Sequence, residues 1–148
     1  MKSDLFTNSP EETIALGRKL AAELSPPLLV ILRGDLGAGK TTLVKGIAEG
    51  FDAAQSEDVT SPTFTLVHDY RGPRVNLYHI DLYRIETERE LESLALDDLA
   101  APDSILLIEW GEKFPRLLRE RNVEIAFERV GETGRRIHLH WADQTESD

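Results

Sequence analysis

An α/β fold in three layers, with a mixed parallel and antiparallel sheet between helices, is predicted by two features of this sequence of 148 residues. Continuous apolar segments at 28–34 and 104–109 are typical of strands covered on both faces, and their alternation with helical segments favours parallel pairing. Paired alternating segments within 64–83 and 122–142 predict two β-hairpins, which add antiparallel strands. The length predicts a single domain over residues 1–148.

Local signals place each element. Ser9, Pro10 and Glu12 form a capping box with a proline at the first helical position, so a helix is predicted to begin there and to end at Pro26-Pro27. The others follow in chain order: a strand at 28–34, a helix at 40–51, a polar loop at 52–62, strands at 64–70 and 74–83, a helix at 86–100, a strand at 104–109, another helix, and strands at 122–130 and 136–142. Residues 143–148 are predicted to be a frayed tail.

The composition narrows the class of protein. No apolar run approaches the roughly 20 residues of a membrane span, the first residues lack the layout of a signal peptide, and there is no cysteine, so we expect a cytoplasmic protein. The net charge of −10 argues against tight autonomous binding of RNA or DNA, which usually requires a basic face. Clusters at Arg116, Arg119 and Arg121, or at Arg135 and Arg136, are interpreted as local basic patches or as solvated surface arginines.

A glycine-rich turn follows the first apolar strand. The segment GDLGAGKT at 34–41 matches G-x-x-x-x-G-K-[ST] in full and opens a predicted helix. Glycines allow backbone N–H groups to converge on phosphate oxygens, and the helix N-terminus adds a partial positive charge. Lys40 is expected to reach the β- and γ-phosphates, Thr41 to ligate Mg²⁺, and Thr42 to contact the α-phosphate. The sequence therefore predicts a site for a nucleoside triphosphate.

A second magnesium ligand is predicted at the end of the other buried strand. Glu109 follows four apolar residues, at the strand end where ligands of open α/β sheets bind. The alternative is an ordinary glutamate at a strand end. Trp110 either packs against the base or ribose or covers the core.

Two further segments carry candidate chemistry. Ser61 or Thr63, in SPTFT, lies where switch segments contact the γ-phosphate, although hydroxyls that satisfy backbone groups are an equal alternative. In HIDLYR, an extended chain places His79, Asp81 and Tyr83 on one face, so Asp81 could position the attacking water; a structural hydrogen-bond ladder is the alternative. His138 and His140 also share a strand face and are interpreted as surface residues rather than metal ligands.

The reaction remains open at this level. The N-K-x-D segment of guanine-selective GTPases is absent, which favours ATP. An ATPase, a P-loop kinase for a small metabolite and a nucleotide-dependent interaction module all agree with the residues described so far.

Four segments, GDLGAGKTT, SPTFTLV, YHIDLYR and LLIEWGEK, in this order and spacing, resemble the bacterial TsaE family, and the resemblance extends from Pro10 to Arg135. It implies a P-loop NTPase-like fold, ATP with Mg²⁺, and slow intrinsic hydrolysis. It further implies a requirement for threonylcarbamoylation of adenosine 37 (t6A) in ANN-decoding tRNAs. The implied partners are TsaB and the transferase TsaD, with ATP hydrolysis supporting the cycling of their complex and tRNA met only through it.

The resemblance also assigns roles to residues of this sequence. It implies magnesium binding by Thr41 and Glu109, and activity that depends on Asp81, Thr63 and Lys40. Residues implied to contact the nucleotide are Gly37, Ala38, Gly39, Lys40, Thr41, Thr42, Glu112 and Arg135.

Overall fold

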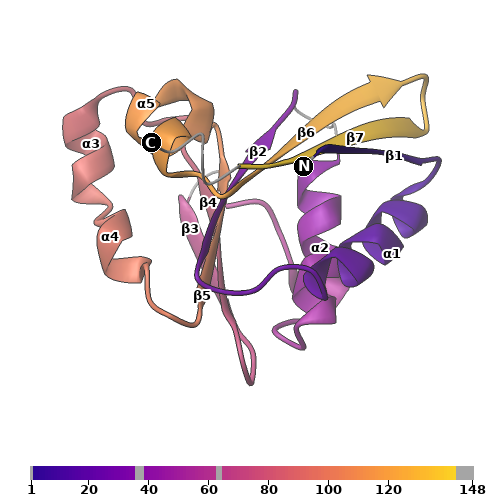
Figure 1. The fold of residues 1–148 in the computed structure, drawn as a ribbon, viewed down its shortest axis with the longest axis horizontal. Helices are drawn as coiled ribbons and strands as arrows, with labels where there is room; N and C mark the ends of the chain where they lie inside the picture. Colours follow the sequence, from indigo (N-terminus) through magenta and orange to yellow (C-terminus); the bar gives the residue numbers. More distant parts are fainter. Residues whose placement is uncertain (1, 36–38, 63–64, 143–148) are drawn as a thin grey trace.

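Seven strands form one mixed sheet in the computed structural model, which describes residues 2–35, 39–62 and 65–142, in the order β1-β7-β6-β2-β5-β4-β3 (Figure 1). The strands are β1 (Lys2–Thr7), β2 (Leu28–Arg33), β3 (Val67–Arg71), β4 (Asn76–Asp81), β5 (Ser104–Glu109), β6 (Val123–Val130) and β7 (Gly134–Trp141). The helices are α1 (Pro10–Ala21), α2 (Lys40–Gly50), α3 (Glu88–Ser93), α4 (Leu96–Leu99) and α5 (Pro115–Glu120), with 3₁₀ turns η1 (Ser56–Asp58) and η2 (Gly111–Lys113).

The pairing of the strands confirms the predicted mixture. β2 runs parallel to β5 and β6, and β4 runs parallel to β5. The hairpins β3–β4 and β6–β7 are antiparallel, and β1 pairs antiparallel with β7. The register sets Glu109 of β5 opposite both Asp81 of β4 and Leu32 of β2, so the carboxyl ends of these strands meet at one edge.

Helices cover both faces of the sheet and give the three predicted layers (Figure 1). One apolar core lies between the sheet and α1 with α2, and a second lies between the sheet and α3 to α5. In β5, Ile105 and Leu107 belong to the first core, whereas Leu106 and Ile108 belong to the second. Every residue of β5 is buried, which explains its continuous apolar sequence.

The crossing of α1 and α2 depends on glycine. A Cβ at Gly46 would collide with the Ile14 carbonyl oxygen, and one at Gly17 would lie 2.8 Å from the Gly46 Cα. The absence of both side chains therefore allows the two helix backbones to approach closely. As predicted, α1 begins after Ser9, whose Oγ accepts a hydrogen bond from the Glu12 N–H at 3.1 Å.

One strand was missed and three predicted elements need correction. The strand β1 was not predicted; its sequence KSDLFT has no clear alternation, and it is an edge strand held mainly by backbone pairing with β7. The helix predicted at 86–100 is interrupted at Ala95, which is left-handed with φ 51°, and so forms α3 and α4. Helix α1 ends at Ala21, before the predicted Pro26-Pro27. β4 ends at Asp81, so Tyr83 lies beyond the strand and does not share the buried face of His79 and Asp81.

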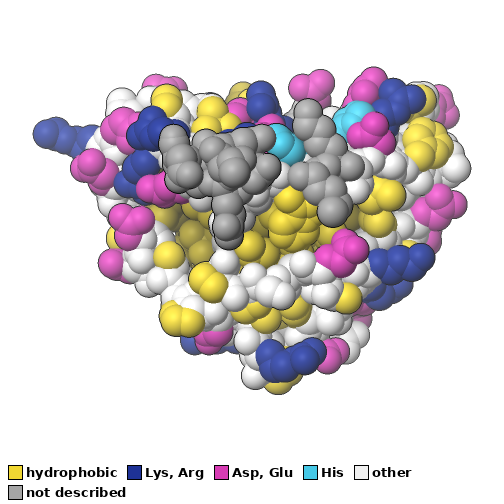
Figure 2. All heavy atoms as spheres, viewed as in Figure 1, with side chains coloured by type: hydrophobic (Ala, Val, Ile, Leu, Met, Phe, Trp, Pro, Cys, Tyr) yellow, Lys and Arg dark blue, Asp and Glu magenta, His cyan; other side chains and the backbone are white. Residues whose placement is uncertain are grey.

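The surface of the molecule mixes both signs of charge. Figure 2 shows basic and acidic side chains scattered over one face. Arg116 lies 3.7 Å from Asp97, and Arg121 lies 2.9 Å from Glu124. These two arginines therefore fit paired surface residues better than a basic patch. Within the part of the chain that the structure describes, no helix combines the length and apolar character needed to cross a membrane.

Candidate nucleotide-binding site

A pocket of about 720 Å³ lies where β4 and β5 end beside the start of α2. Its wall combines five regions of the chain: the start of α1, the start of α2, the loop at Ser61, the ends of β4 and β5 with the residues that follow them, and the β6–β7 turn. Its lining residues are Ser9, Pro10, Thr13, Gly39, Lys40, Thr41, Thr42, Ser61, Asp81, Tyr83, Glu109, Trp110, Glu132, Thr133 and Arg135. The volume is that of a cleft for a small organic ligand.

The N-terminus of α2 opens into this pocket. Gly39 precedes the helix with φ 106°, a left-handed conformation that side-chain-bearing residues rarely adopt, and none of the described side chains caps the helix. The first backbone N–H groups of the helix thus have no partner within the helix, and its dipole favours an anion there. Thr41 and Thr42 line the pocket beside Gly39, whereas the predicted contacts Gly37 and Ala38 lie outside the described residues.

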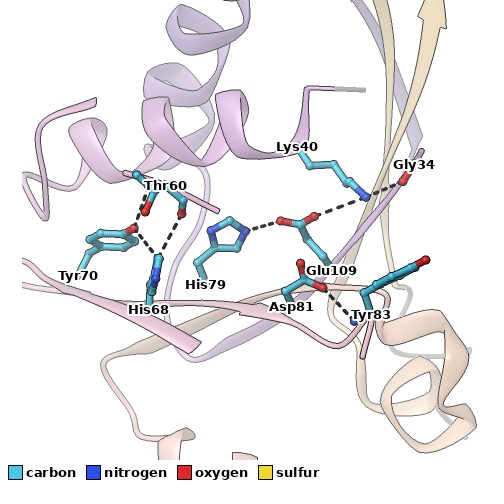
Figure 3. A network of polar contacts seen from close by, with 9 residues as sticks. All are labelled: Gly34, Lys40, Thr60, His68, Tyr70, His79, Asp81, Tyr83 and Glu109. Carbon is cyan, nitrogen blue, oxygen red and sulfur yellow. Dashed lines mark hydrogen bonds and ion pairs between the residues drawn. The ribbon is translucent and has the colours of Figure 1, made fainter. Parts of the chain in front are cut away.

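Lys40 extends along the pocket floor with its side chain only 6% exposed. Its Nζ donates to the Gly34 carbonyl oxygen at 2.5 Å and lies 3.5 Å from Glu109 Oε1 (Figure 3). It also lies 5.2 Å from the centroid of the Trp110 ring. These contacts offset the cost of burying an ammonium group, and they hold it at the place where the helix N-terminus favours an anion.

Glu109 ends β5 in a buried position, as predicted. Its Oε2 lies 2.6 Å from His79 Nε2, while Oε1 faces Lys40. Burial alone would raise the pKa of this carboxyl, but the hydrogen bond from His79 and the charges of His79 and Lys40 outweigh burial, so the pKa lies below its ordinary value. Glu109 is therefore an ionised carboxylate at neutral pH.

Asp81 lies beside Glu109 on the neighbouring strand. It is 5% exposed, and its Oδ1 accepts a hydrogen bond from the Tyr83 N–H at 2.9 Å. The Tyr83 ring is 59% exposed and packs against Trp110, with 5.3 Å between the ring centroids. Trp110 itself packs against the second core and also lines the pocket, so both interpretations of this indole agree with its position.

Lys113 fastens the turn after Asp81 and was not singled out in the sequence. Its Nζ donates to the carbonyl oxygens of Leu82, Tyr83 and Ile85, at 3.1, 3.0 and 2.6 Å. This ammonium joins η2, which follows Glu109, to the segment that fixes the Asp81 carboxylate. No sequence signal distinguishes Lys113 from any other surface lysine. Its three acceptors are backbone carbonyl oxygens, which every residue type carries.

The other predicted site residues differ in their placement. Arg135 lines the pocket, and its Nη1 donates to the carbonyl oxygens of Gly134 and Glu132. Glu112 is not among the lining residues; its Oε1 is buried and has no hydrogen-bond partner among the described residues. Thr63 lies outside the described residues, although Ser61 of the same segment lines the pocket.

His138 lies away from this pocket, on the β1–β7 pair. Its Nδ1 lies 2.6 Å from Asp4 Oδ1, and its side chain is 41% exposed. No cluster of three or more histidine, aspartate, glutamate or cysteine residues suited to a metal ion occurs within residues 2–35, 39–62 and 65–142. The partial exposure of His138 and its contact with Asp4 fit a surface histidine.

A family model described as "Threonylcarbamoyl adenosine biosynthesis protein TsaE" matches residues 7–137. The chain belongs to the TsaE family. The family predicted from the four segments is thus confirmed.

Curated relatives and a solved structure agree with this assignment. The chain is 40% identical over 131 residues to the tRNA threonylcarbamoyladenosine biosynthesis protein TsaE of Bacillus subtilis, covering 88% of this chain and 80% of the relative. It is 42% identical over 115 residues to the protein of that name from Nostoc sp., covering 75% of this chain and 69% of the relative. The fold matches the crystal structure of Bacillus subtilis YdiB with a TM-score of 0.75 and 32% identity, covering 98% of this chain and 88% of that one.

Proposed function

We propose that this TsaE-family protein binds ATP with Mg²⁺ in the pocket at the start of α2 and hydrolyses it slowly. The observation that carries the proposal is the buried Lys40 ammonium, held against Glu109 beside an uncapped helix N-terminus. The names of the relatives, tRNA threonylcarbamoyladenosine biosynthesis proteins, support a role in forming this modification (t6A) on tRNA. The proposed site of the modification is adenosine 37 of ANN-decoding tRNAs.

The chain's own groups provide the binding of the phosphates. The first backbone N–H groups of α2 donate to phosphate oxygens, and Lys40 turns from the Gly34 carbonyl toward the β- and γ-phosphates. Arg135, which lines the same pocket near Gly39, adds a second cation. Such a movement of Lys40 would leave Glu109 Oε1 available to a metal ion.

The donor set fits magnesium. Mg²⁺ prefers oxygen ligands, and the pocket offers the ionised Glu109 carboxylate together with the Thr41 hydroxyl. The 3.5 Å separation between Lys40 Nζ and Glu109 Oε1 is too long for a strong hydrogen bond, so Oε1 keeps its acceptor capacity. When bound, the ion would neutralise charge on the phosphate oxygens.

Asp81 is the proposed positioning group for the attacking water. Its carboxylate lines the pocket next to Glu109, and the Tyr83 N–H fixes its orientation. Thr63 stays a proposed second contributor, because the segment that contains it follows the pocket residue Ser61.

The proposed partners are TsaB and TsaD, and the nucleotide would control the cycling of their complex rather than act on the tRNA base. An acidic chain suits this arrangement, because contact with tRNA through partners requires no basic face on this protein.

Binding is tested by isothermal titration calorimetry of ATP with and without Mg²⁺. We expect saturable binding of ATP, with a higher affinity in the presence of Mg²⁺ than in its absence. An absence of heat under both conditions would contradict the nucleotide site.

The reaction is tested by phosphate release from wild type and Asp81→Ala, alone and with TsaB and TsaD. We expect slow release by the wild type, faster release with the partners, and loss in the variant. Background rates in every mixture would instead support a nucleotide-dependent interaction module. A phosphorylated metabolite would support the kinase alternative.

Participation in tRNA modification is tested by reconstitution. Partners, ATP, tRNA and the precursors of the threonylcarbamoyl group are combined with and without this chain, and t6A is measured. Sustained modification that does not depend on this chain would refute the proposed role.

A further inference from the structure

His79 is a fully buried polar residue that the proposed function leaves unused. Its exposure is 0%, and its Nε2 lies 2.6 Å from Glu109 Oε2. Its Nδ1 has no hydrogen-bond partner among the described residues. Because burial of a polar ring is unfavourable unless hydrogen bonds compensate it, the contact with Glu109 is the interaction that accounts for a histidine here.

The strand register explains how the imidazole reaches this carboxylate. His79 on β4 lies opposite Leu107 on β5, and Glu109 follows Leu107 by two residues on the same face. The contact is therefore a diagonal pair between neighbouring parallel strands. Figure 3 shows His79 on one side of the Glu109 carboxylate and Lys40 on the other.

The two oxygens of Glu109 consequently have different surroundings. Oε2 is held by the imidazole, whereas Oε1 faces the Lys40 ammonium at 3.5 Å. A glutamate carboxylate rotates readily about its last side-chain bond, and Mg²⁺ accepts only near-ideal octahedral geometry. Holding one oxygen fixes the direction of the other.

We propose that His79 is a positioning residue, which holds Glu109 Oε2 by a hydrogen bond from Nε2 and so keeps Oε1 directed into the pocket as a magnesium ligand. This inference rests on the proposed nucleotide function and extends it to a residue that does not touch the ligand. Partners that orient a ligating side chain typically contribute about 10–100-fold to metal affinity.

The test is calorimetric titration with the β,γ-imido analogue of ATP at a series of Mg²⁺ concentrations and in EDTA. We expect His79→Leu to raise the Mg²⁺ concentration that gives half of the affinity gain by about 10–100-fold. Affinity in EDTA should stay near that of the wild type. His79→Gln, whose amide nitrogen can take the place of Nε2, should restore most of the Mg²⁺ dependence, because it can still donate to Oε2.

A packing control, Leu77→Ala, and a second His79 variant, His79→Asn, separate the positioning role of His79 from its role in packing. Leu77→Ala removes a fully buried side chain from the same strand and the same face, two residues earlier. It should lower the melting temperature without changing the Mg²⁺ dependence. If His79→Leu fails to fold, as judged by circular dichroism, the comparison of His79→Gln with the shorter His79→Asn carries the test, since only glutamine reaches Oε2.

Each outcome decides the inference. Wild-type Mg²⁺ dependence in folded His79→Leu or His79→Asn would overturn it, and so would a His79→Gln variant no better than His79→Leu. An absence of binding by the wild-type protein would refute the proposed function and this inference together. The two kinds of failure are distinguishable. Failure of the proposed function appears in the wild-type protein, whereas failure of the His79 inference appears only in the comparison of variants.

Discussion

Three side chains from three elements form a buried polar group beside the pocket: Lys40 of α2, Glu109 of β5 and His79 of β4. The lysine and glutamate side chains are 6% and 7% exposed, and the histidine is not exposed at all. In such surroundings the charges of Lys40 and Glu109 are stabilised mainly by contacts within this group. Removal of one member thus affects the others as well as the ligand.

Lys40→Ala is expected to weaken ATP binding by about 2–5 kcal/mol, because phosphate oxygens in the pocket lose a buried charged donor. Calorimetry measures this change. Lys19→Ala, which removes an exposed lysine from α1, is the matched control and should leave ATP affinity unchanged. Equal affinities for wild type and Lys40→Ala would count against the site.

The pKa of Glu109 predicts a dependence of stability on pH. Its folded-state pKa lies below the ordinary 4.5, so the ionised carboxylate stabilises the fold above that pH. This contribution is lost as the pH falls below 4.5 and through the folded-state value. The free energy of unfolding of wild type, measured relative to Glu109→Gln in urea, should therefore decrease from pH 6 toward pH 3. The exposed Glu23→Gln is the control, and an equal decrease there would contradict the assignment to Glu109.

At the residue scale, the sequence predicted the pocket residues whose type and spacing are set by phosphate and magnesium binding. Lys40 and Glu109 were found because a phosphate loop and a strand-end carboxylate have fixed local patterns, and the structure brings them together. His79 was noticed only as a neighbour of Asp81, because the pairing of β4 with β5 decides which carboxylate it meets. Pocket residues such as Thr13 and Thr133 carry no local signal, since they are defined by the meeting of distant segments.

Among the elements, the crossing of α1 and α2 is the most sensitive to substitution. Gly46→Ala would place a methyl group against the Ile14 carbonyl and the Gly17 Cα, so the helices must separate. Overpacking costs about 1–3 kcal/mol and occasionally more, and the clash with backbone atoms of α1 puts Gly46→Ala at about 3 kcal/mol or above. Urea unfolding measures the loss. Gly131→Ala, where a Cβ meets nothing within 4 Å but φ is 71°, should cost only about 1–2 kcal/mol. Equal losses in the two variants would exclude a special role for the crossing.

Elements with strong local signals were predicted well. The capping box before α1, the apolar runs of β2 and β5, and both hairpins all appear in the structure. β1 was missed because backbone pairing to β7 requires no apolar pattern on an edge strand. The break at Ala95 was missed because alanine is a strong helix former, and packing of Leu91 and Leu96 into the second core decides otherwise.

At the scale of the whole molecule, the acidic charge is the feature with the broadest consequence. A net charge of −10 opposes the approach of another polyanion, and the basic side chains in Figure 2 are interspersed with acidic ones. We expect the isolated protein to show no tight, salt-sensitive binding of tRNA in a filter-binding assay at moderate salt. A lysine-rich nucleic-acid-binding protein serves as the positive control. Binding that weakens steeply with salt would contradict an indirect route to tRNA.

The architecture as a whole was predictable because strands and helices alternate along the chain, which leaves few ways to build the sheet. The order of the strands in the sheet could not be predicted from the sequence. β2 lies between β5 and β6, and this placement depends on which apolar faces the five helices cover rather than on any local motif.

This strand order also bears on protein synthesis. The glycine-rich segment at 34–41 is synthesised before the strands that pair with β2. β2 can pair with β5 and β6 only after residues 104–130 have been synthesised. The wall of the pocket formed by the β6–β7 turn also requires residues 132–135. A nascent chain stalled at residue 100 would carry the whole glycine-rich signature without a formed cleft. Nucleotide bound at the proposed site would therefore assist folding only after residues 132–135 have been synthesised.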